Sequence, residues 1–189
     1  MCLTEPECGS DLGAIKTIAA AQDDGTYLIN GTKIFITNAG GGIGLVLAKV
    51  KGEEDNVNGL SLFLVEQDHP NKEGNNFEVV KNEEKMGLHG SFTCMVTYEN
   101  TIGKLIGKKN EGFKYMLHLM NEARIAVGMQ ALGGIENCLD YARKYADERI
   151  AFDKPISQLP LLKRNLEDFE TERDAIRALL VDTCSHYDI

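Results

Sequence analysis

The sequence predicts an α+β fold, in which an antiparallel β-barrel or β-sandwich is followed by a helical hairpin that is part of a helix bundle. Residues 1–110 hold most of the glycine and several short alternating apolar runs, which are typical of strands. Residues 111–189 are rich in Ala, Leu, Arg and Glu at helical spacing. We therefore expect two domains, 1–110 and 111–189, with the boundary near Gly107–Gly112.

The strand candidates follow one another without a helical pattern between them, so a Rossmann unit is disfavoured and the sheet should be antiparallel. Asn30-Gly31 is a strong hairpin signal, and it predicts a tight turn between strands over 27–30 and 33–37. Further strands are predicted over 45–50, 60–66, 77–80 and 93–98.

Two long amphipathic helices are predicted after residue 111. The first should run from Gly112 to about Arg149, because apolar residues recur there at steps of three, four and seven. Asp153-Lys154-Pro155 then breaks the pattern, and Pro160 suits a first helical turn. The expected buried stripes are Phe113, Met116, Met120, Val127, Ala131, Ile135, Cys138 and Tyr145 on the first helix, and Leu162, Leu166, Phe169, Ile176 and Leu180 on the second.

The composition excludes several function classes. The chain has 189 residues and a formal charge of −9, which repels a nucleic-acid backbone. Its apolar stretches are too interrupted by charge for a membrane span, and the N-terminus lacks the features of a secretory signal. The 5 cysteines are scattered without a CxxC pair, which favours a reducing compartment. We expect a cytoplasmic protein without nucleic-acid partners.

Several chemical signals are weak. The Gly40–Gly44 cluster fits no phosphate-binding register and precedes a strand, so a mobile turn is favoured over a phosphate loop. The histidines lack metal-ligand spacing, and no GxSxG elbow indicates a covalent hydrolase. His118 suits a partly buried helix position, whereas His89 lies in a glycine-flanked turn and stays open to a functional role.

A stronger signal combines residues 3–11 with residues 35–38. Alone, the first segment is a capped turn, in which Pro6 restricts φ, Gly9 permits a positive φ, and Ser10 and Asp11 bond the local backbone. However, Thr4 and Thr37 each end an apolar run. Their hydroxyls and amides at one sheet edge would suit a planar ring rich in hydrogen-bonding groups.

These segments carry a family resemblance that covers nearly the whole chain. LTEPECGSD resembles the LTEPxAGSD signature of the acyl-CoA dehydrogenases, and four further segments follow in that family's order and approximate spacing: KIFITNAG, KMGLHGSFTC, NEGFKYMLHLMNEARIAVGMQALGG and YADERIAF. The chain is thus similar to the middle β-domain and the start of the C-terminal helical domain. KMGLHGS and MNEARIAVG are closer to the larger bacterial members, whose relatives include methylthiopropanoyl-CoA dehydrogenases.

The resemblance implies an FAD enzyme of fatty acid metabolism and β-oxidation, which oxidises an acyl-CoA to the trans-2-enoyl-CoA. It also implies an electron-transfer flavoprotein as electron acceptor and a homo-dimeric or tetrameric parent protein. The implied cofactor-binding residues are Leu3, Thr4, Gly9, Ser10, Phe35, Ile36, Thr37 and Arg149, and the implied substrate-binding residues are Ser10, Asn121 and Arg124.

Within that set, the resemblance places Thr37 near the flavin N5, Thr4 at the pyrimidine side of the ring, and Ser10 at the flavin pyrophosphate or the CoA arm. Arg149 would reach the FAD of a neighbouring subunit, or act as a cation at the end of a helix. Arg124 would contact CoA, or anchor the helix to the sheet.

The resemblance yields no catalytic base and no metal site. The usual glutamate lies beyond Ile189, and its alternative position, before the long-helix arginine, is Ala123. Glu122 is turned from that position by about 100°. We therefore expect a fragment cut at both ends and inactive by itself. Two alternatives stay open: a non-enzymatic acyl-CoA or flavin binding module, and a scaffold protein with an unused pocket.

The sequence also departs from the family pattern at two positions. Asp153 stands where a glycine usually follows the ERxxF run, and Phe35 stands where the flavin-facing strand often has tryptophan. We therefore expect stacking near the ring to differ from that in other members.

Overall fold

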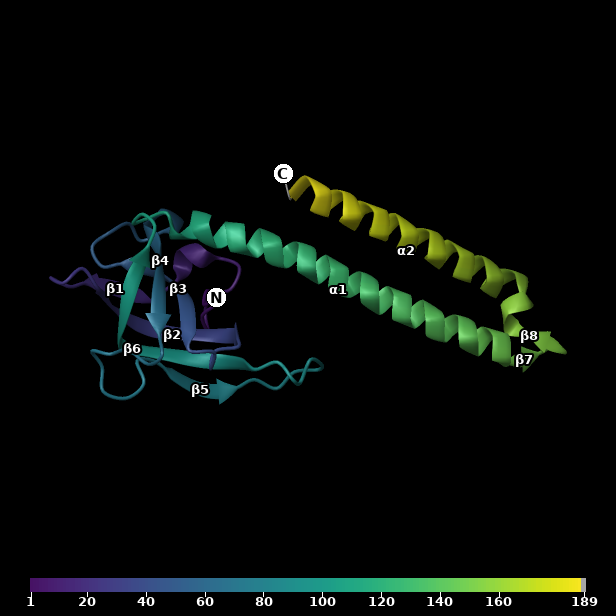
Figure 1. Cartoon of the computed structure of the whole chain (residues 1–189), viewed down its shortest axis with the longest axis horizontal. Helices are drawn as coiled ribbons and strands as arrows, with labels where there is room; N and C mark the ends of the chain where they lie inside the picture. Colours follow the sequence, from purple (N-terminus) through teal and green to yellow (C-terminus); the bar gives the residue numbers. More distant parts are fainter. Residues whose placement is uncertain (188–189) are drawn as a thin grey trace. The chain divides into compact units, whose positions relative to one another are not determined.

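The computed structural model describes residues 1–187, and it separates into two compact units. The first unit, Met1–His118, holds the β-structure and the first residues of the long helix, and the second unit begins at Leu119 within that helix and is helical (Figure 1). The α+β class predicted from the sequence is confirmed. Among the described helices, none is both long enough and apolar enough to cross a membrane.

Six strands form the sheet of the first unit: β1 (Ile18–Ala21), β2 (Tyr27–Thr37), β3 (Ile43–Val50), β4 (Leu60–Glu66), β5 (Glu78–Asn82) and β6 (Thr93–Ile106). Their order is β2-β1-β3-β4-β6-β5, and β2 also pairs with β6. That extra pairing closes five strands into a barrel and leaves β5 attached to the outside of the ring. All pairings are antiparallel except that of β1 with β3, which is parallel.

The hairpin predicted at Asn30-Gly31 is wrong, because β2 continues through both residues. Asn30 instead bonds across to β6, where its Oδ1 accepts the Asn100 amide at 2.9 Å. Gly31 is required by close packing: a Cβ there would lie 2.3 Å from Thr17 Oγ1. The glycine therefore makes room for a neighbouring side chain instead of reversing the chain.

The other strand predictions differ mainly at their ends. The strand over 60–66 is confirmed as β4, while β6 continues to Ile106, well past the predicted end at residue 98. The short, alanine-rich β1 was not predicted. Gly40–Gly42 lie in the turn from β2 into β3, whereas Gly44 is already in β3, and no helix follows the cluster. A turn in place of a phosphate loop is therefore confirmed, while its mobility stays a prediction.

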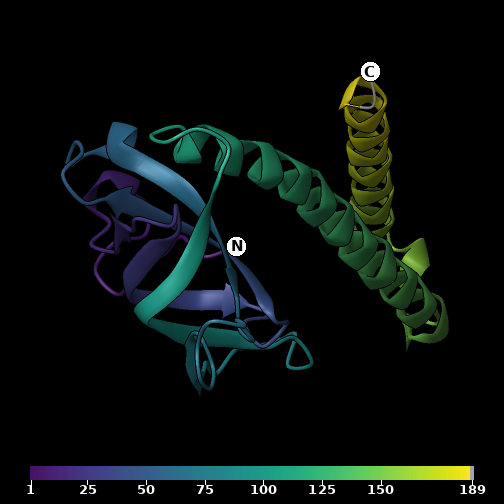
Figure 2. The same ribbon diagram turned by 60° about the vertical axis from the view of Figure 1, so that its left-hand side comes forward.

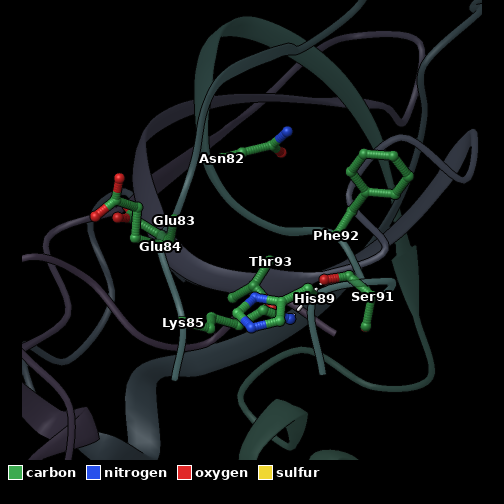
Figure 3. A pocket seen from close by; sticks show the side chains of 8 residues that line it. All are labelled: Asn82, Glu83, Glu84, Lys85, His89, Ser91, Phe92 and Thr93. Atoms are coloured by element: carbon green, nitrogen blue, oxygen red, sulfur yellow. Dashed lines mark hydrogen bonds between the residues drawn. The ribbon is translucent and has the colours of Figure 1, made fainter. Parts of the chain in front are cut away.

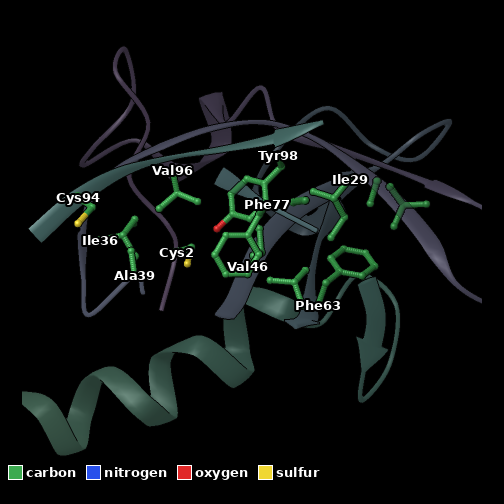
Figure 4. Close-up of a cluster of buried hydrophobic side chains, with 14 residues drawn as sticks. Cys2, Ile29, Ile36, Ala39, Val46, Phe63, Phe77, Cys94, Val96 and Tyr98 are labelled. Atoms are coloured by element: carbon green, nitrogen blue, oxygen red, sulfur yellow. The ribbon is translucent and has the colours of Figure 1, made fainter. Parts of the chain in front are cut away.

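The core of the first unit fills the barrel (Figure 4). Phe63 of β4 and Tyr98 of β6 are each at most 2% exposed. The Tyr27 ring lies 4.9 Å from Phe63, and the Phe77 ring lies 5.8 Å from Tyr98, both tilted. Burying such a side chain contributes about 1.5–3 kcal/mol, so this cluster gives the strands a stable common interior.

The second unit is a helical hairpin, as the sequence predicted. Helix α1 (Gly112–Glu148) begins at the predicted residue, and α2 (Pro160–Tyr187) begins at the predicted proline (Figure 2). They are joined by strands β7 (Ile150–Ala151) and β8 (Lys154–Pro155) and by a 3-10 helix, Ile156–Gln158. Phe152 and Asp153 form the turn between the two strands with φ of 53° and 62°, a left-handed pair typical of tight hairpins.

The predicted buried stripes are only partly correct. On α1, Leu132, Leu139 and Ala146 are buried at seven-residue spacing, whereas Val127 and Tyr145 are each 62% exposed. The helix is apolar on more than one face, so periodicity alone did not select the face that meets α2. On α2, Leu166 is buried, but Phe169 is 53% exposed and Ile176 is 37% exposed.

Candidate functional site

The N-terminal segment packs beside β2 and β3 through backbone hydrogen bonds. Cys2 pairs with β3, where its amide donates to the Leu45 carbonyl at 2.7 Å. The Ile34 amide of β2 donates to the Thr4 carbonyl at 2.9 Å. Glu5 and Cys8 exchange two backbone bonds across the Pro6-Glu7 turn. Leu3 and Thr4 are therefore held directly against the second half of β2.

A buried ion pair lies under this segment. The Lys33 ammonium, with 0% side-chain exposure, donates to Glu5 Oε1 at 2.9 Å and to the Leu3 carbonyl at 2.8 Å. The Glu5 carboxylate also accepts from the Thr17 amide at 3.0 Å, the Thr17 hydroxyl, and the Lys16 amide at 2.7 Å. The carboxylate is thus saturated with donors.

This environment shifts the pKa values of both groups. Burial lowers the pKa of Lys33, and Glu5 opposes that shift only in part. Burial acts to raise the pKa of Glu5, but the Lys33 ammonium and the donated hydrogen bonds outweigh it, so the pKa of Glu5 lies below its usual value. Sequence reasoning missed this pair. A lysine in a strand is ordinarily exposed, and only its place in an apolar run could have indicated burial.

The structure places the N-terminal segment beside β2, and the predicted residues on these two segments differ in exposure. Leu3 and Ile36 are buried, Thr4 is half-buried, and Phe35 and Thr37 are exposed. Phe35 has a φ of 58° where the pairing of β2 with β6 shifts register between Lys33 and Ile36. This β-bulge leaves Phe35 60% exposed while Ile36 stays in the core.

Gly9 and Ser10 follow the Glu5–Cys8 turn in the N-terminal segment. A Cβ on Gly9 would come 3.8 Å from the Thr4 methyl group, so Gly9 is beside Thr4. The expected positive φ at Gly9 is wrong, since Gly9 is absent from the positive-φ glycines. The expected local bond of Asp11 is present, because its Oδ1 accepts the Gly13 amide at 3.1 Å. Ser10 is exposed, and its hydroxyl bonds no group within residues 1–187.

The hydroxyls of Thr4 and Thr37 have no hydrogen-bond partner in the part of the chain that the structure describes. The two threonines lie on adjoining segments, because the Thr4 carbonyl accepts the Ile34 amide of β2 and Thr37 is three residues further along the same strand. Of the adjacent apolar residues, Phe35 is exposed, whereas Leu3 and Ile36 are buried. This combination of free donors and apolar surface suits a flat, polar-edged ring.

A hollow of about 380 Å³ is lined by residues between Asn82 and Thr93. Thr93, on its wall, pairs with Thr37 in the sheet, and the Asn38 amide donates to the Phe92 carbonyl at 2.7 Å. Lys85 Nζ donates to the Leu88 and Ser91 carbonyls at 2.8 and 2.5 Å. His89 lies in this wall and is exposed (Figure 3). The lining is Asn82, Glu83, Glu84, Lys85, His89, Ser91, Phe92 and Thr93.

Three predicted residues belong to the helical unit. Arg124 donates to Asn121 Oδ1 at 2.9 Å on α1, so the two residues expected to bind CoA form one exposed polar pair. Arg149 follows α1 directly and is exposed, and its carbonyl accepts the Ile156 amide at 2.9 Å. Among the described residues, no group of three or more His, Cys, Asp or Glu is placed to hold a metal ion.

Comparison with known proteins supplies relatives over the whole chain. The sequence is 38% identical to acryloyl-CoA reductase (NADH) of Anaerotignum propionicum, over 94% of the chain and 45% of that protein. It is 38% identical to 3-methylmercaptopropionyl-CoA dehydrogenase of Ruegeria pomeroyi, over 100% of the chain and 35% of that protein. The chain therefore spans less than half the length of these relatives.

Several solved structures have the same fold as this chain. Butyryl-CoA dehydrogenase of Megasphaera elsdenii superposes with a TM-score of 0.86 at 34% identity, over 96% of this chain and 47% of that one. An acyl-CoA dehydrogenase of Bacillus anthracis complexed with FAD has a TM-score of 0.81 at 28% identity, over 95% and 30%. A chain solved in work on the electron transferring flavoprotein of Acidaminococcus fermentans has a TM-score of 0.84 at 36% identity, over 96% and 47%.

Two family models account for most of the sequence. The acyl-CoA dehydrogenase middle domain matches residues 1–101, and the acyl-CoA dehydrogenase C-terminal domain matches residues 110–188. The first match alone covers more than half of the chain and includes the ion pair and both free threonine hydroxyls. The chain belongs to the acyl-CoA dehydrogenase family.

Proposed function

We propose that this chain forms the flavin-binding β-domain and part of the helical domain of an FAD-dependent acyl-CoA dehydrogenase. The reaction would oxidise an acyl-CoA thioester to the trans-2-enoyl-CoA. FAD, when bound, would accept the hydride from the substrate's β-carbon. The observation that carries the proposal is the pair of unpartnered hydroxyls, Thr4 and Thr37, held on adjoining segments of a barrel of this family.

The residues present fit a flavin by the chemistry of their donors. An isoalloxazine ring has apolar faces and an edge of nitrogen and oxygen acceptors, so it needs donors beside an apolar surface. Thr4 and Thr37 provide free hydroxyl donors, Phe35 provides exposed apolar surface, and the neighbouring Leu3 and Ile36 are buried apolar residues. The Bacillus anthracis relative complexed with FAD supports the same cofactor.

Each residue of the first unit would then have a distinct task. The Thr37 hydroxyl would donate near N5, and Thr4 would donate at the pyrimidine side of the ring. Gly9 and Ser10 would adjoin the flavin pyrophosphate, with Ser10 also able to meet the CoA arm. Donors fixed by β2 and by the N-terminal segment need no reorganisation when negative charge develops on a reduced ring. Their contribution is therefore polarisation and orientation.

The helical unit would contribute to the CoA site and to a subunit contact. Asn121 and Arg124, joined by a hydrogen bond of 2.9 Å, would bind the CoA portion. The exposed Arg149 would reach the FAD of a neighbouring subunit in a homo-dimer or tetramer. The bonding of Arg149's carbonyl to Ile156 supports this role, because it leaves the side chain free while fixing the backbone.

We propose no catalytic base among the 189 residues. The position before the arginine is Ala123, which offers no carboxylate. The adjacent Glu122 is exposed and accepts a hydrogen bond of 3.5 Å from the Tyr187 hydroxyl. The α-proton of the substrate would therefore need a carboxylate from another segment of the protein.

Two further parts of the proposal concern partners and location. An electron-transfer flavoprotein is the proposed acceptor of electrons from the reduced cofactor, and the Acidaminococcus fermentans match supports it. A cytoplasmic location is supported by five free cysteines, of which Cys2, Cys8 and Cys94 are buried in the barrel unit. Free thiols of this kind persist in reducing compartments.

The test of the flavin site is the Thr37→Val variant, which keeps the shape and removes the hydroxyl. We expect the purified chain to bind FAD, and the variant to bind it about three- to tenfold more weakly through loss of one hydrogen bond. Fluorescence titration with FAD gives both dissociation constants. The matched control is Thr32→Val on the same strand, whose hydroxyl faces Thr97 at 3.5 Å. Equal weakening by both variants would contradict the assignment.

Turnover separates the enzyme from the alternatives. The chain with FAD, an acyl-CoA and an artificial electron acceptor should bind the flavin and show no turnover, because the base is missing. Substantial activity would mean that the base has been misplaced. Absence of any FAD binding would favour a scaffold protein with an unused pocket. A reading frame that continues past Ile189 into a helix carrying a suitable glutamate would exclude a non-enzymatic binding module.

A further inference from the structure

We propose that the buried Lys33–Glu5 pair is a positioning device, which holds Thr4 against β2 and thereby sets the distance between the two flavin-facing threonines. The inference rests on the proposed flavin site. It assigns no chemical step to either charge, because both side chains are buried, at 0% and 5% exposure. It concerns how the donors are held before the cofactor arrives.

The first support is that one ammonium group bonds both neighbours of Thr4. Lys33 Nζ lies 2.8 Å from the Leu3 carbonyl and 2.9 Å from Glu5 Oε1. Within residues 1–187, Thr4 itself makes one hydrogen bond, in which its carbonyl accepts the Ile34 amide at 2.9 Å. The Thr4 hydroxyl thus stays free while the backbone on both sides of it is fixed.

The second support is that the holding residue and the second donor share one strand. Lys33 precedes Phe35, where the bulge begins, and Thr37 ends the strand. A displacement of the ammonium along β2 would therefore move Thr4 relative to Thr37. Two donors that bind one rigid ring must be held at a fixed distance from each other. If Thr4 and Thr37 are misplaced, the affinity falls even though both hydroxyls are present.

The third support is the completeness of the network around the carboxylate. Glu5 accepts from Lys33, from the Lys16 amide and twice from Thr17, and Gly31 leaves room for the Thr17 side chain. Apolar residues of similar volume commonly stabilise a core as well as a buried ion pair does. A saturated network of directional hydrogen bonds also fixes the positions of the groups it joins, which burial alone does not do.

The decisive variant neutralises both partners, Lys33→Met with Glu5→Gln, so that no unpaired charge is buried. We expect a folded β-unit in which the Ile34 amide, which reports the position of Thr4, exchanges its hydrogen about tenfold faster. FAD should bind about tenfold more weakly, because the donors are no longer preorganised. Hydrogen exchange is measured without FAD, and affinity by fluorescence titration.

The matched control is Lys16→Met with Glu7→Gln. This pair belongs to the same segment, but its side chains are 74% and 73% exposed. The control should change neither the Ile34 exchange rate nor the FAD affinity. Unchanged exchange and unchanged affinity in the Lys33/Glu5 variant would overturn the proposal and leave the pair a purely structural one.

A milder variant covers the case in which the double variant does not fold. Thr17→Val removes one donor to Glu5 and keeps the side-chain shape. It should accelerate Ile34 exchange and weaken FAD binding by about two- to threefold each, and no change in either would overturn the proposal. If the unaltered chain binds no FAD, the proposed function fails, and the exchange rates alone then decide whether the pair holds Thr4.

Discussion

At the scale of the residue, burial of charge distinguishes this β-unit from an ordinary barrel. Lys33 and Glu5 are 0% and 5% exposed, in a chain whose other ion pairs are largely at the surface. The pair is stable because each charge has a partner and the carboxylate collects additional donors. Removing one partner would leave the other charge unpaired in the interior, which is costly.

This burial makes stability depend on pH through Glu5. The folded-state pKa of Glu5 lies below its value in the unfolded chain. Its carboxylate therefore stabilises the fold above the unfolded pKa of about 4.3, and the contribution disappears as pH falls through the folded-state pKa. We expect Glu5→Gln to lower the free energy of unfolding by about 3 kcal/mol at pH 7, and by clearly less near pH 3.

Urea unfolding of both proteins between pH 7 and pH 3 provides the measurement. Glu7→Gln is the control, since Glu7 is two residues away but exposed, and solvent screens its pairing with Lys16. Its effect should be small at every pH. A difference between unaltered chain and Glu5→Gln that stayed constant down to pH 3 would contradict the assigned role of the charge.

At the scale of the element, the helical hairpin depends on a close approach at Gly128. A Cβ there would lie 2.8 Å from Leu180 Cδ2 on α2, whereas one on Gly133 would meet nothing within 4 Å. Both glycines are inside α1 and weaken it intrinsically. Only Gly128 is placed where the helices need a small residue. The two helices are further linked by the pairs Arg143–Glu170 and Arg177–Glu136.

The two glycines should therefore respond differently to alanine. We expect Gly133→Ala to stabilise the hairpin by about 0.5–1 kcal/mol through helix propensity. Gly128→Ala should gain less than this or destabilise, because the new methyl group displaces Leu180. Denaturation followed by helical circular dichroism measures both. When Leu180 is also changed to Ala, the two glycine substitutions should raise the free energy of unfolding equally. If Leu180 is kept and Gly128→Ala still stabilises as much as Gly133→Ala, the contact is refuted.

At the scale of the whole molecule, the described chain leaves much apolar surface on the helical unit. An apolar groove of about 670 Å³ lies between α1 and α2, lined by residues that include Ile135, Leu139, Leu166 and Phe169. Val127, Leu179 and Val181 are also more than half exposed. Exposed apolar surface of this extent is unusual for a monomeric domain.

We expect the isolated chain either to bind the dye ANS on this surface or to bury it by self-association. Light scattering combined with ANS fluorescence measures both outcomes. Phe169→Lys should reduce whichever is seen, because it places a charge in the groove. Lys163, already exposed on α2, offers the control Lys163→Arg, which should change neither. A monomer that binds no ANS would contradict the expectation.

Local patterns in the sequence by themselves determined the helices, most strands and the family of this protein. Helical periodicity with Gly112 and Pro160 at the starts predicted both helices, and alternation with turn residues predicted most strands. The LTEPECGSD and KIFITNAG segments indicated the family, which the comparisons confirm. Such features depend on neighbours in the chain, so sequence expresses them directly. The assigned cofactor and CoA residues remain predictions.

Only the tertiary structure decided the remainder, because each of these features depends on residues distant in sequence. Gly31 belongs to a continuous strand since Thr17 fills the space of its missing side chain. The choice of Leu132 and Leu139 over Val127 as the buried face of α1 required the position of α2. Lys33 is charged and buried because Glu5, 28 residues away, meets it inside the barrel unit. Packing partners, and not the residue types alone, gave these side chains their roles.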